Sequence, residues 1–327
     1  MGIREVAALA GVSTTTVSHA LSGRRAVSPA TQQRVDAAVA ELGYRPSAVA
    51  RSLRTQRTHT VALLVPDIAN PFYPAVARGL QDAVAAQDLF TVVGSTDGDR
   101  GRELGFVEEM LARQVDGLVL FTFALDDTDL QRVVGERTHL VVASGGVTDR
   151  YDTVTSDDAH GVEEAATYLL SQGIQDVAFV SGPEGVGPGD GRLAGFTAAL
   201  RRVGMTTEGR VARGPYTVAG GQAAVTALLS GPSRPAAVVC ANDLMAVGAL
   251  RAAAEAGLRV PEDVAVVGFD DIDAAALVTP GLTTVRNPAY ELGRRCGQTL
   301  LGRISGTDVG PPRDIQVPTD LVVRGSA

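Results

Sequence analysis

The stretch GVSTTTVSHALSGRR, residues 11–25, places three consecutive threonines shortly after a glycine. Threonine is a poor helix former, because its branched Cβ loses rotamer freedom and its hydroxyl competes for backbone groups. Both flanks of the stretch nevertheless carry the apolar spacing of helices. We therefore expect the threonines in the first turn of a helix, where low helix propensity matters least.

Three short helices are predicted around this stretch. Apolar residues at positions 3, 6, 7 and 10 form one helical face, and Gly11 ends that helix. Ser13 is a suitable N-cap for a second helix, whose buried face we expect at positions 17, 20 and 21. Ser28 and Pro29 predict the start of a third helix, which Gly43 ends. Three helices with a glycine turn between the first two are typical of a helix-turn-helix domain, here residues 1–45.

The second helix of such a domain enters the major groove of DNA with its N-terminal end. Short hydroxyl side chains there can bond to base edges and phosphates, and a threonine methyl can touch a thymine methyl. The alternative is that the threonines only cap the helix. Because further polar and basic residues follow, we predict DNA contacts at Thr14, Thr15, Thr16, Ser18, His19, Arg24 and Arg25.

Charge divides the chain in the same place. Residues 1–57 carry eight arginines against three acidic residues, a net +5, so the total of −8 leaves −13 for the remainder. A basic head on an acidic body is typical of a nucleic-acid-binding domain joined to a domain that does not bind DNA. Chance variation within a short segment is the alternative explanation.

Several classes of protein are not indicated. The sequence has no apolar run of the ~20 residues that a membrane span needs and no signal-peptide pattern, so we expect a cytoplasmic protein with no membrane partner. The two cysteines, Cys240 and Cys296, are too few for a disulfide framework and suit reduced packing residues. The four scattered histidines offer no metal-ligand spacing. We expect neither a metal nor a cofactor.

The body shows alternating strands and helices. Apolar runs typical of buried parallel strands occur at 60–66, 89–95, 116–121 and 139–144, and again at 176–182, 236–241, 263–269 and 282–285. Helical stretches such as 73–86 separate them. The predicted fold class is therefore α/β, with two doubly wound parallel-sheet lobes after the helix-turn-helix head.

Ligand-binding residues of open α/β sheets cluster just past the carboxyl ends of the strands. Asn and Asp offer hydrogen bonds to vicinal hydroxyls, Arg offers a planar fork of donors, and an aromatic ring can cover an apolar face. Each such residue can instead be a loop cap. The predicted ligand-contacting residues are Phe72, Tyr73, Ser144, Arg192, Tyr216, Asn242 and Asp270.

At family level, the sequence resembles the lac repressor/galactose repressor family, and its head is most similar to the purine-repressor branch. The resemblance covers essentially the whole chain and rests on GVSTTTVSHAL, ELGYRPSAVARSL (41–53), AVVCANDLMAVGAL (237–250), DVAVVGFDDI (263–272) and LTTVRNP (282–288). It implies a transcriptional regulator with lobes of periplasmic-binding-protein type and an effector between them. Gly2 departs from the family, which usually caps its first helix with threonine or serine.

The resemblance also implies a hinge at 46–58, a segment too short to hold as an isolated helix. In the family this hinge pairs with that of a dimer partner in the minor groove, and Leu53 matches an inserted apolar wedge. The implied hinge contacts are Ser47, Ala50, Arg51, Leu53 and Arg54. The implied partners are a palindromic operator and a second copy of the chain. The implied effector domain, 59–327, divides into lobe one (59–156 and 287–315) and lobe two (157–286 and 316–327).

The effector stays open at this point. Purine-binding members read the base with an arginine and a threonine in the loop before RLAGF, where this chain has Val186 and Pro188. Asn242 favours a sugar, sugar derivative or nucleoside, whereas Ser144 stands where sugar binders often have aspartate. A corepressor-dependent purine-type regulator remains the alternative. A dinucleotide-dependent enzyme, suggested by GDGRLA (189–194), is disfavoured because its loop is too long and no catalytic set is present, so we predict no enzyme.

Overall fold

The structure is a computed structural model of the 327-residue chain and describes residues 2–22, 25–45, 52, 57–135, 138–144 and 150–327. The chain forms two compact units, Met1–Thr58 and His59–Ala327. Each unit is described by itself.

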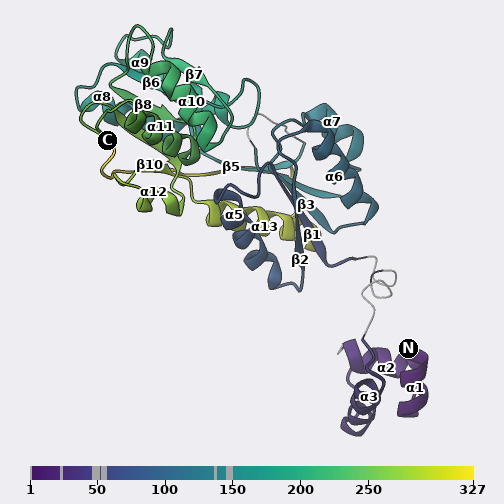
Figure 1. The fold of residues 1–327 in the computed structure, drawn as a ribbon. Helices are drawn as coiled ribbons and strands as arrows, with labels where there is room; N and C mark the ends of the chain where they lie inside the picture. The colour runs from purple at the N-terminus through teal and green to yellow at the C-terminus, as the bar shows by residue number, and fades with distance from the viewer. Residues whose placement is uncertain (1, 23–24, 46–51, 53–56, 136–137, 145–149) are drawn as a thin grey trace. The chain divides into compact units, whose positions relative to one another are not determined.

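The first unit contains three helices, α1 (Ile3–Ala10), α2 (Thr14–Ser22) and α3 (Pro29–Leu42) (Figure 1). Gly11 and Gly43 end α1 and α3 in the left-handed conformation, with φ of 63° and 57°, which glycine adopts without steric cost. The core consists of Val6, Ala7, Ala10, Val17, Val35 and Ala38. Of the positions that the helical spacing predicted for the first two helices, 6, 7, 10 and 17 are buried, and 3, 20 and 21 pack against this core while partly buried.

The second unit contains two six-stranded sheets with the same arrangement. The first has the order β11-β5-β4-β3-β1-β2 and the second the order β12-β10-β9-β8-β6-β7. Neighbouring strands are parallel except β10 and β12, which pair antiparallel. The first sheet comprises β1 (Thr60–Val65), β2 (Phe90–Ser95), β3 (Gly117–Leu120), β4 (His139–Val142), β5 (Asp152–Ser156) and β11 (Asp314–Val317). The second comprises β6 (Val177–Ser181), β7 (Val211–Arg213), β8 (Ala237–Cys240), β9 (Ala265–Asp270), β10 (Thr283–Arg286) and β12 (Asp320–Val322).

Helices follow the strands, as a doubly wound fold requires. Lobe one, the lobe of the first sheet, contains α5 (Phe72–Ala85), α6 (Arg100–Ala112), α7 (Asp127–Val133) and α13 (Ala289–Ser305). Lobe two, the lobe of the second sheet, contains α8 (Asp158–Ser171), α9 (Gly189–Arg202), α10 (Val218–Leu229), α11 (Asp243–Glu255) and α12 (Asp273–Leu277). Figure 1 shows α5 and α13 side by side, and these two helices pack on each other.

The chain passes between the lobes three times, after β5, after β10 and after β11. The α/β fold with two parallel-sheet lobes is therefore confirmed. The polar strand β5 and the short strands β7, β11 and β12 were not predicted, because none is a continuous apolar run.

One predicted strand is placed differently from expectation. Residues 89–95 were expected to form a buried strand, but β2 lies at the edge of the first sheet. Phe90, Val92 and Val93 are 72%, 42% and 39% exposed. An apolar run shows that a segment is hydrophobic, but not where its strand lies in the sheet. It therefore cannot distinguish a central strand from an apolar edge strand.

Candidate functional site

The exposed end of α2 is the candidate nucleic-acid interface of the first unit. Ser13 Oγ accepts a hydrogen bond from the Thr16 backbone N–H at 3.0 Å and lies 2.9 Å from Thr16 Oγ1. Thr16 is half-buried in this N-cap, whereas Thr14 and Thr15 are exposed. Both interpretations of the threonines therefore apply, since one hydroxyl serves the cap and two face outward.

The remaining predicted DNA contacts divide by location. Ser18 and His19 are half-buried on α2, and Arg25 is exposed. The other predicted DNA-contacting residues lie outside the residues that the structure describes; they are Arg24, Ser47, Ala50, Arg51, Leu53 and Arg54.

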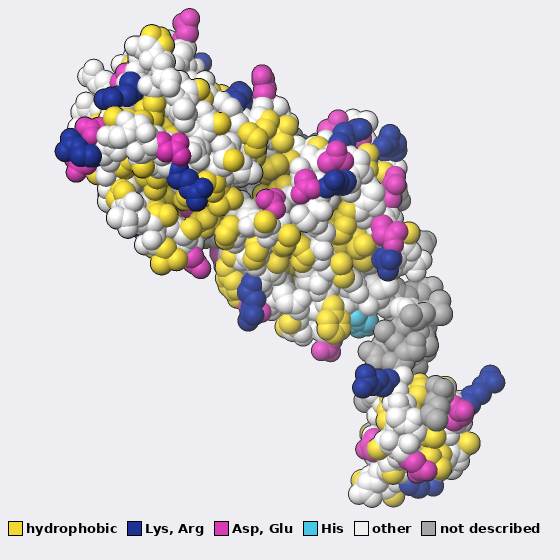
Figure 2. Space-filling view, in the orientation of Figure 1, with side chains coloured by type: hydrophobic (Ala, Val, Ile, Leu, Met, Phe, Trp, Pro, Cys, Tyr) yellow, Lys and Arg dark blue, Asp and Glu magenta, His cyan; other side chains and the backbone are white. Residues whose placement is uncertain are grey.

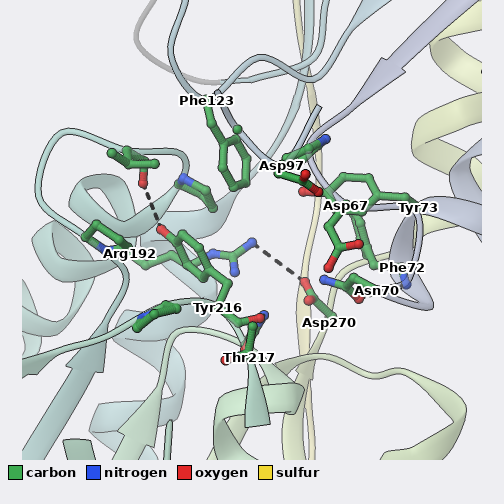
Figure 3. A pocket seen from close by; sticks show the side chains of 17 residues that line it. Asp67, Asn70, Phe72, Tyr73, Asp97, Phe123, Arg192, Tyr216, Thr217 and Asp270 are labelled. Atoms are coloured by element: carbon green, nitrogen blue, oxygen red, sulfur yellow. Dashed lines mark hydrogen bonds and ion pairs between the residues drawn. The ribbon is translucent and has the colours of Figure 1, made fainter. Parts of the chain in front are cut away.

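A cavity of about 330 Å³ opens at the carboxyl ends of both sheets of the second unit (Figure 3). Its lobe-one wall follows β1, β2 and β3, and its lobe-two wall follows β6, β7, β8 and β9. This is the place where open α/β sheets bind ligands. The lining residues with polar or aromatic side chains are Asp67, Asn70, Phe72, Tyr73, Asp97, Phe123, Arg192, Tyr216, Thr217, Asn242 and Asp270.

Arg192 is buried at the centre of the lobe-two wall, with 5% of its surface exposed. It lies in the first turn of α9, and one terminal nitrogen (Nη1) donates to the Ala241 carbonyl. The other (Nη2) lies 3.3 Å from Asp158 Oδ1 and 3.7 Å from Asp270 Oδ1. Burial would lower the pKa of Arg192, but the two carboxylates outweigh it and raise the pKa. The Arg192 guanidinium therefore stays charged. Its Nε has no hydrogen-bond partner among the described residues.

Asp270 ends β9 in an unusual backbone conformation, with φ of 112°. It is 7% exposed, and burial, reinforced by Asp158, raises its pKa to about 7 against the opposing effects of Arg192 and Asn287. A carboxylate that titrates near neutrality can act as a hydrogen-bond acceptor or as a donor.

Neighbouring groups hold the turn that carries Asp270. Asp243 Oδ2 accepts the Ile272 backbone N–H at 2.8 Å. Asp271, which has φ of 54°, forms ion pairs with Arg286 at 3.0 Å and with Arg324 at 2.6 Å. Arg286 is the last residue of β10, directly before the second passage between the lobes.

Asn242 and Tyr216 complete the lobe-two wall. Asn242 is the N-cap of α11, and its Oδ1 accepts the Met245 N–H at 2.9 Å. The Tyr216 hydroxyl donates to the Val186 carbonyl at 3.0 Å, and burial raises the pKa of Tyr216 to about 12. Gly182 makes room for this ring, because a Cβ there would lie 2.0 Å from it.

The lobe-one wall is largely aromatic. Phe72 and Tyr73 meet edge to face with ring centroids 5.3 Å apart. Phe123 reaches Tyr216 on the opposite wall at a centroid distance of 5.6 Å. It also lies against Gly187, where a Cβ would be 2.8 Å from the ring and where φ is 66°. Phe123 is thus a direct contact between the lobes at the edge of the cavity (Figure 3).

A buried carboxylate fixes the loop that carries Phe123. Glu103 of α6 is completely buried and accepts the backbone N–H groups of Phe123 at 2.9 Å and of Ala124 and Leu125 at 3.2 Å. The Thr122 hydroxyl donates to the same carboxylate. Four donors compensate for the loss of water around Glu103.

The structure brings six of the seven predicted ligand residues together around one cavity. Ser144 is the exception, because it does not line the cavity and its buried Oγ has no partner among the described residues. Ser144 lies just beyond β4, whereas the lobe-one residues that line the cavity follow β1, β2 and β3. Sequence reasoning missed Asp67, Asn70, Asp97, Phe123 and Thr217, although most of them also follow strand ends.

The glycines of GDGRLA do not form a dinucleotide-binding turn. Gly189 and Gly191 lie within α9, and residues 182–188 separate them from the end of β6. A dinucleotide fingerprint places its glycines in the turn directly after the strand. Among the described residues, moreover, no helix has the length and apolar character to cross a bilayer, and no three potential metal ligands gather.

Comparisons with known proteins match both units. Residues 2–47 match the family described as bacterial regulatory proteins, lacI family, and residues 166–327 match the periplasmic binding protein-like domain. The ribose operon repressor of Escherichia coli (strain K12) is 37% identical over 329 residues, which cover 99% of each chain.

Solved structures agree with this assignment. The lac repressor dimer bound to operator and the anti-inducer ONPF has a TM-score of 0.89 at 28% identity, over 100% of this chain and 98% of that chain. A LacI family regulator from Enterococcus faecium with bound ribose has a TM-score of 0.74 at 29% identity, over 82% of this chain and 98% of that one. With its helix-turn-helix head and two-lobed body, the chain therefore belongs to the LacI family and is a DNA-binding transcriptional regulator.

Proposed function

We propose that this regulator is a homodimeric repressor whose affinity for a palindromic operator is controlled by a sugar, sugar derivative or nucleoside held between the lobes. The cavity carries the proposal, because both lobes line it and it joins hydrogen-bonding side chains to aromatic rings. A ligand that contacts both walls favours one arrangement of the lobes over another, which is how a small molecule shifts a two-state protein.

The proposed effector contacts are Phe72, Tyr73, Arg192, Tyr216, Asn242 and Asp270. Their chemistry suits a ring with hydroxyl groups, since amide and carboxylate oxygens accept from hydroxyls and an aromatic face covers the apolar side of a sugar ring. The similarity to the ribose operon repressor and to the ribose-bound structure supports this class. The purine-type alternative gains no support, because Val186 and Pro188 line the cavity without a side-chain donor for a base.

The head and hinge are proposed to contact DNA as the sequence predicted. Thr14, Thr15 and His19 lie on the helix that would enter the major groove, and Leu53 in the segment 46–58 would insert at the centre of the operator. A two-fold symmetric dimer presents two such helices, which is why the operator is expected to be a palindrome.

Exposed apolar side chains of the second unit support a dimer. Phe90, Val92 and Val93 of β2 are exposed, as are Leu277 at 81% and Tyr290 at 46%. Figure 2 shows hydrophobic side chains gathered on the face of this unit that carries α5, α12 and α13. Contiguous exposed apolar surface marks interaction sites on soluble proteins.

Selection of random DNA by the full chain, followed by a thermal-shift screen of sugars and nucleosides, tests the proposal. We expect a palindromic sequence, a dimer in sedimentation, and a ligand that both raises the melting temperature and changes operator affinity. A single asymmetric half-site would contradict the dimer on a palindrome. A ligand that raises the melting temperature but leaves operator affinity unchanged would contradict the proposal that a small molecule controls DNA binding.

A further inference from the structure

The charges around the cavity are unbalanced. Among the described lining residues, Arg192 is the one basic side chain, whereas Asp67, Asp97 and Asp270 are acidic. A fourth carboxylate, that of Asp158, lies behind the guanidinium at 3.3 Å. Asp97 forms an ion pair with Arg102 and Asp270 faces Arg192 at 3.7 Å, so among the described lining residues Asp67 is the carboxylate without an arginine partner.

The Arg192 guanidinium has little capacity left for an anion. One of its terminal nitrogens donates to a backbone carbonyl, the other faces two carboxylates, and its plane lies over the Phe269 ring at 3.7 Å from the centroid. Only Nε is without a partner among the described residues. Bidentate recognition of a phosphate needs two parallel N–H donors, and this guanidinium does not offer two unpaired ones.

Helix N-termini, the other common anion-binding device, are also engaged here. Asn70 Oδ1 accepts the Phe72 N–H of α5 at 3.1 Å, and Asn242 Oδ1 accepts the Met245 N–H of α11 at 2.9 Å. The first turn of α9 contains Asp190, whose carboxylate adds negative charge at that end. At each of α5 and α11, a side-chain oxygen thus already occupies one N–H group, and Asp190 opposes an anion at α9.

The same arrangement suits an uncharged polyol. The carboxylates and amide oxygens can accept hydrogen bonds from hydroxyl groups, and the aromatic rings of the lobe-one wall can cover apolar ring faces. The volume of about 330 Å³ is at the small end of ligand pockets, which run from ~300 to 1,000 Å³, and so favours a molecule of one or two rings.

Building on the proposed function, we infer that the effector is an uncharged polyhydroxylated ring, as in free sugars and nucleosides, and that the cavity discriminates against the phosphorylated form of the same molecule. The carboxylates that accept hydrogen bonds from the hydroxyl groups of the unphosphorylated ligand would repel the phosphate group of the phosphorylated ligand. The regulator would then respond to the substrate of a kinase reaction rather than to its product.

Isothermal titration of the full-length protein with matched pairs tests the inference. The pairs are D-ribose and D-ribose 5-phosphate, D-glucose and D-glucose 6-phosphate, and adenosine and adenosine 5′-monophosphate. We expect the free form of at least one pair to bind and its phosphorylated form to bind at least ~tenfold more weakly. A phosphorylated form that binds as tightly or more tightly overturns the inference but leaves the proposed function in place. If no member of any pair binds, the proposed effector class itself is wrong.

Charge-removing variants separate electrostatics from steric exclusion. Asp67→Asn and Asp97→Asn keep the side-chain shape, and we expect the double variant to reduce the discrimination several-fold by strengthening binding of the phosphorylated form. Asp88→Asn is a matched control, because Asp88 is exposed outside the cavity and has φ of 55°, close to the 56° of Asp97. Discrimination that is identical in the double variant and in the wild type would contradict the role of charge.

Discussion

The two walls of the cavity differ in how their side chains are held. In lobe two, Arg192, Asn242 and Tyr216 each form hydrogen bonds within their own lobe. In lobe one, the wall consists of rings and of carboxylates on the loops that follow β1, β2 and β3, and Phe123 makes its ring contact with the opposite lobe. The polar wall is therefore organised before a ligand arrives, whereas part of the aromatic wall depends on the other lobe for its contacts.

The difference indicates that the two walls have different roles, one in recognising the ligand and the other in the movement of the lobes. Side chains that are already fixed lose little conformational freedom on binding, so they suit the recognition of hydroxyl positions. The contact of Phe123 in lobe one with Tyr216 in lobe two involves two rings and no charge. The lobes can therefore separate there without leaving a buried charge unpaired, so we expect this contact to break when the lobes move apart. The predictions below test this division, from the largest expected effect to the smallest.

Arg192→Ala should have the largest effect, because it removes the cation between Asp158 and Asp270. Loss of one partner of a buried ion pair costs ~3–5 kcal/mol, so we expect a lower melting temperature together with loss of effector binding. Arg192→Lys keeps the charge but not the planar fork, and should retain more of the stability while binding the ligand found in the thermal-shift screen much more weakly. Melting curves and calorimetric titrations of both variants measure the two effects. If Arg192→Lys bound the sugar as the wild type does, the guanidinium would not be a recognition element.

Glu103→Gln should destabilise the loop that carries Phe123. The amide group of Gln turns one acceptor into a donor that faces backbone N–H groups, and an unsatisfied buried group costs ~1–3 kcal/mol. Glu109→Gln on the same helix is the matched control, because Glu109 is exposed and forms a surface ion pair with Arg113. Urea unfolding compares the two variants. Equal stabilities would show that the buried carboxylate does not hold the loop.

Effector affinity should depend on pH through Asp270. Its pKa is raised to about 7, so the carboxylate that accepts a ligand hydroxyl predominates above pH 7 and is lost below it. If only the charged form binds, affinity falls towards ~tenfold per pH unit below that pKa. Titration of D-ribose between pH 6 and pH 8 measures the effect, and Asp270→Asn should abolish the dependence. Affinity that rises as the pH falls would mean that protonated Asp270 acts as a donor.

Phe123→Leu should have the smallest effect. An aromatic pair contributes ~0.5–1.5 kcal/mol beyond its buried area, so loss of the contact with Tyr216 should weaken sugar binding about two- to tenfold. Stability should change less than in Glu103→Gln, because Phe123 lies at the edge of the cavity. An unchanged affinity would show that the contact between Phe123 and Tyr216 does not contribute to ligand binding.

Features set by local spacing were predictable from the sequence. The helices of the head follow from their apolar faces and from caps such as Ser28, whose Oγ accepts the Thr31 N–H. The two lobes follow from alternating apolar runs and helical stretches. The candidate cavity was predicted in large part, because side chains just beyond neighbouring parallel strands must meet at one edge of a sheet.

Features set by contacts distant in the sequence were not predictable. Nothing near Glu103 in the sequence indicates that it binds a loop about twenty residues further along. Phe123 lies two residues beyond the apolar run 116–121, and its contact with Tyr216 depends on how the two lobes meet. Ser144 followed the same strand-end rule as Asn242, but it is not among the residues that line the cavity.

Asp270 and Asp271 are neighbours in the chain, but their side chains contact different groups. Asp270 is proposed to face the ligand. Asp271 pairs with Arg286, the last residue of β10 before the second passage between the lobes, and with Arg324, which follows β12. Arg286 also reaches Asp320, 3.1 Å away at the start of β12. A rotation of the peptide group between Asp270 and Asp271 would therefore move both carboxylates. A proposed ligand-binding residue is thus joined, through one peptide bond and an ion pair, to the residue at which the chain leaves β10 for the other lobe.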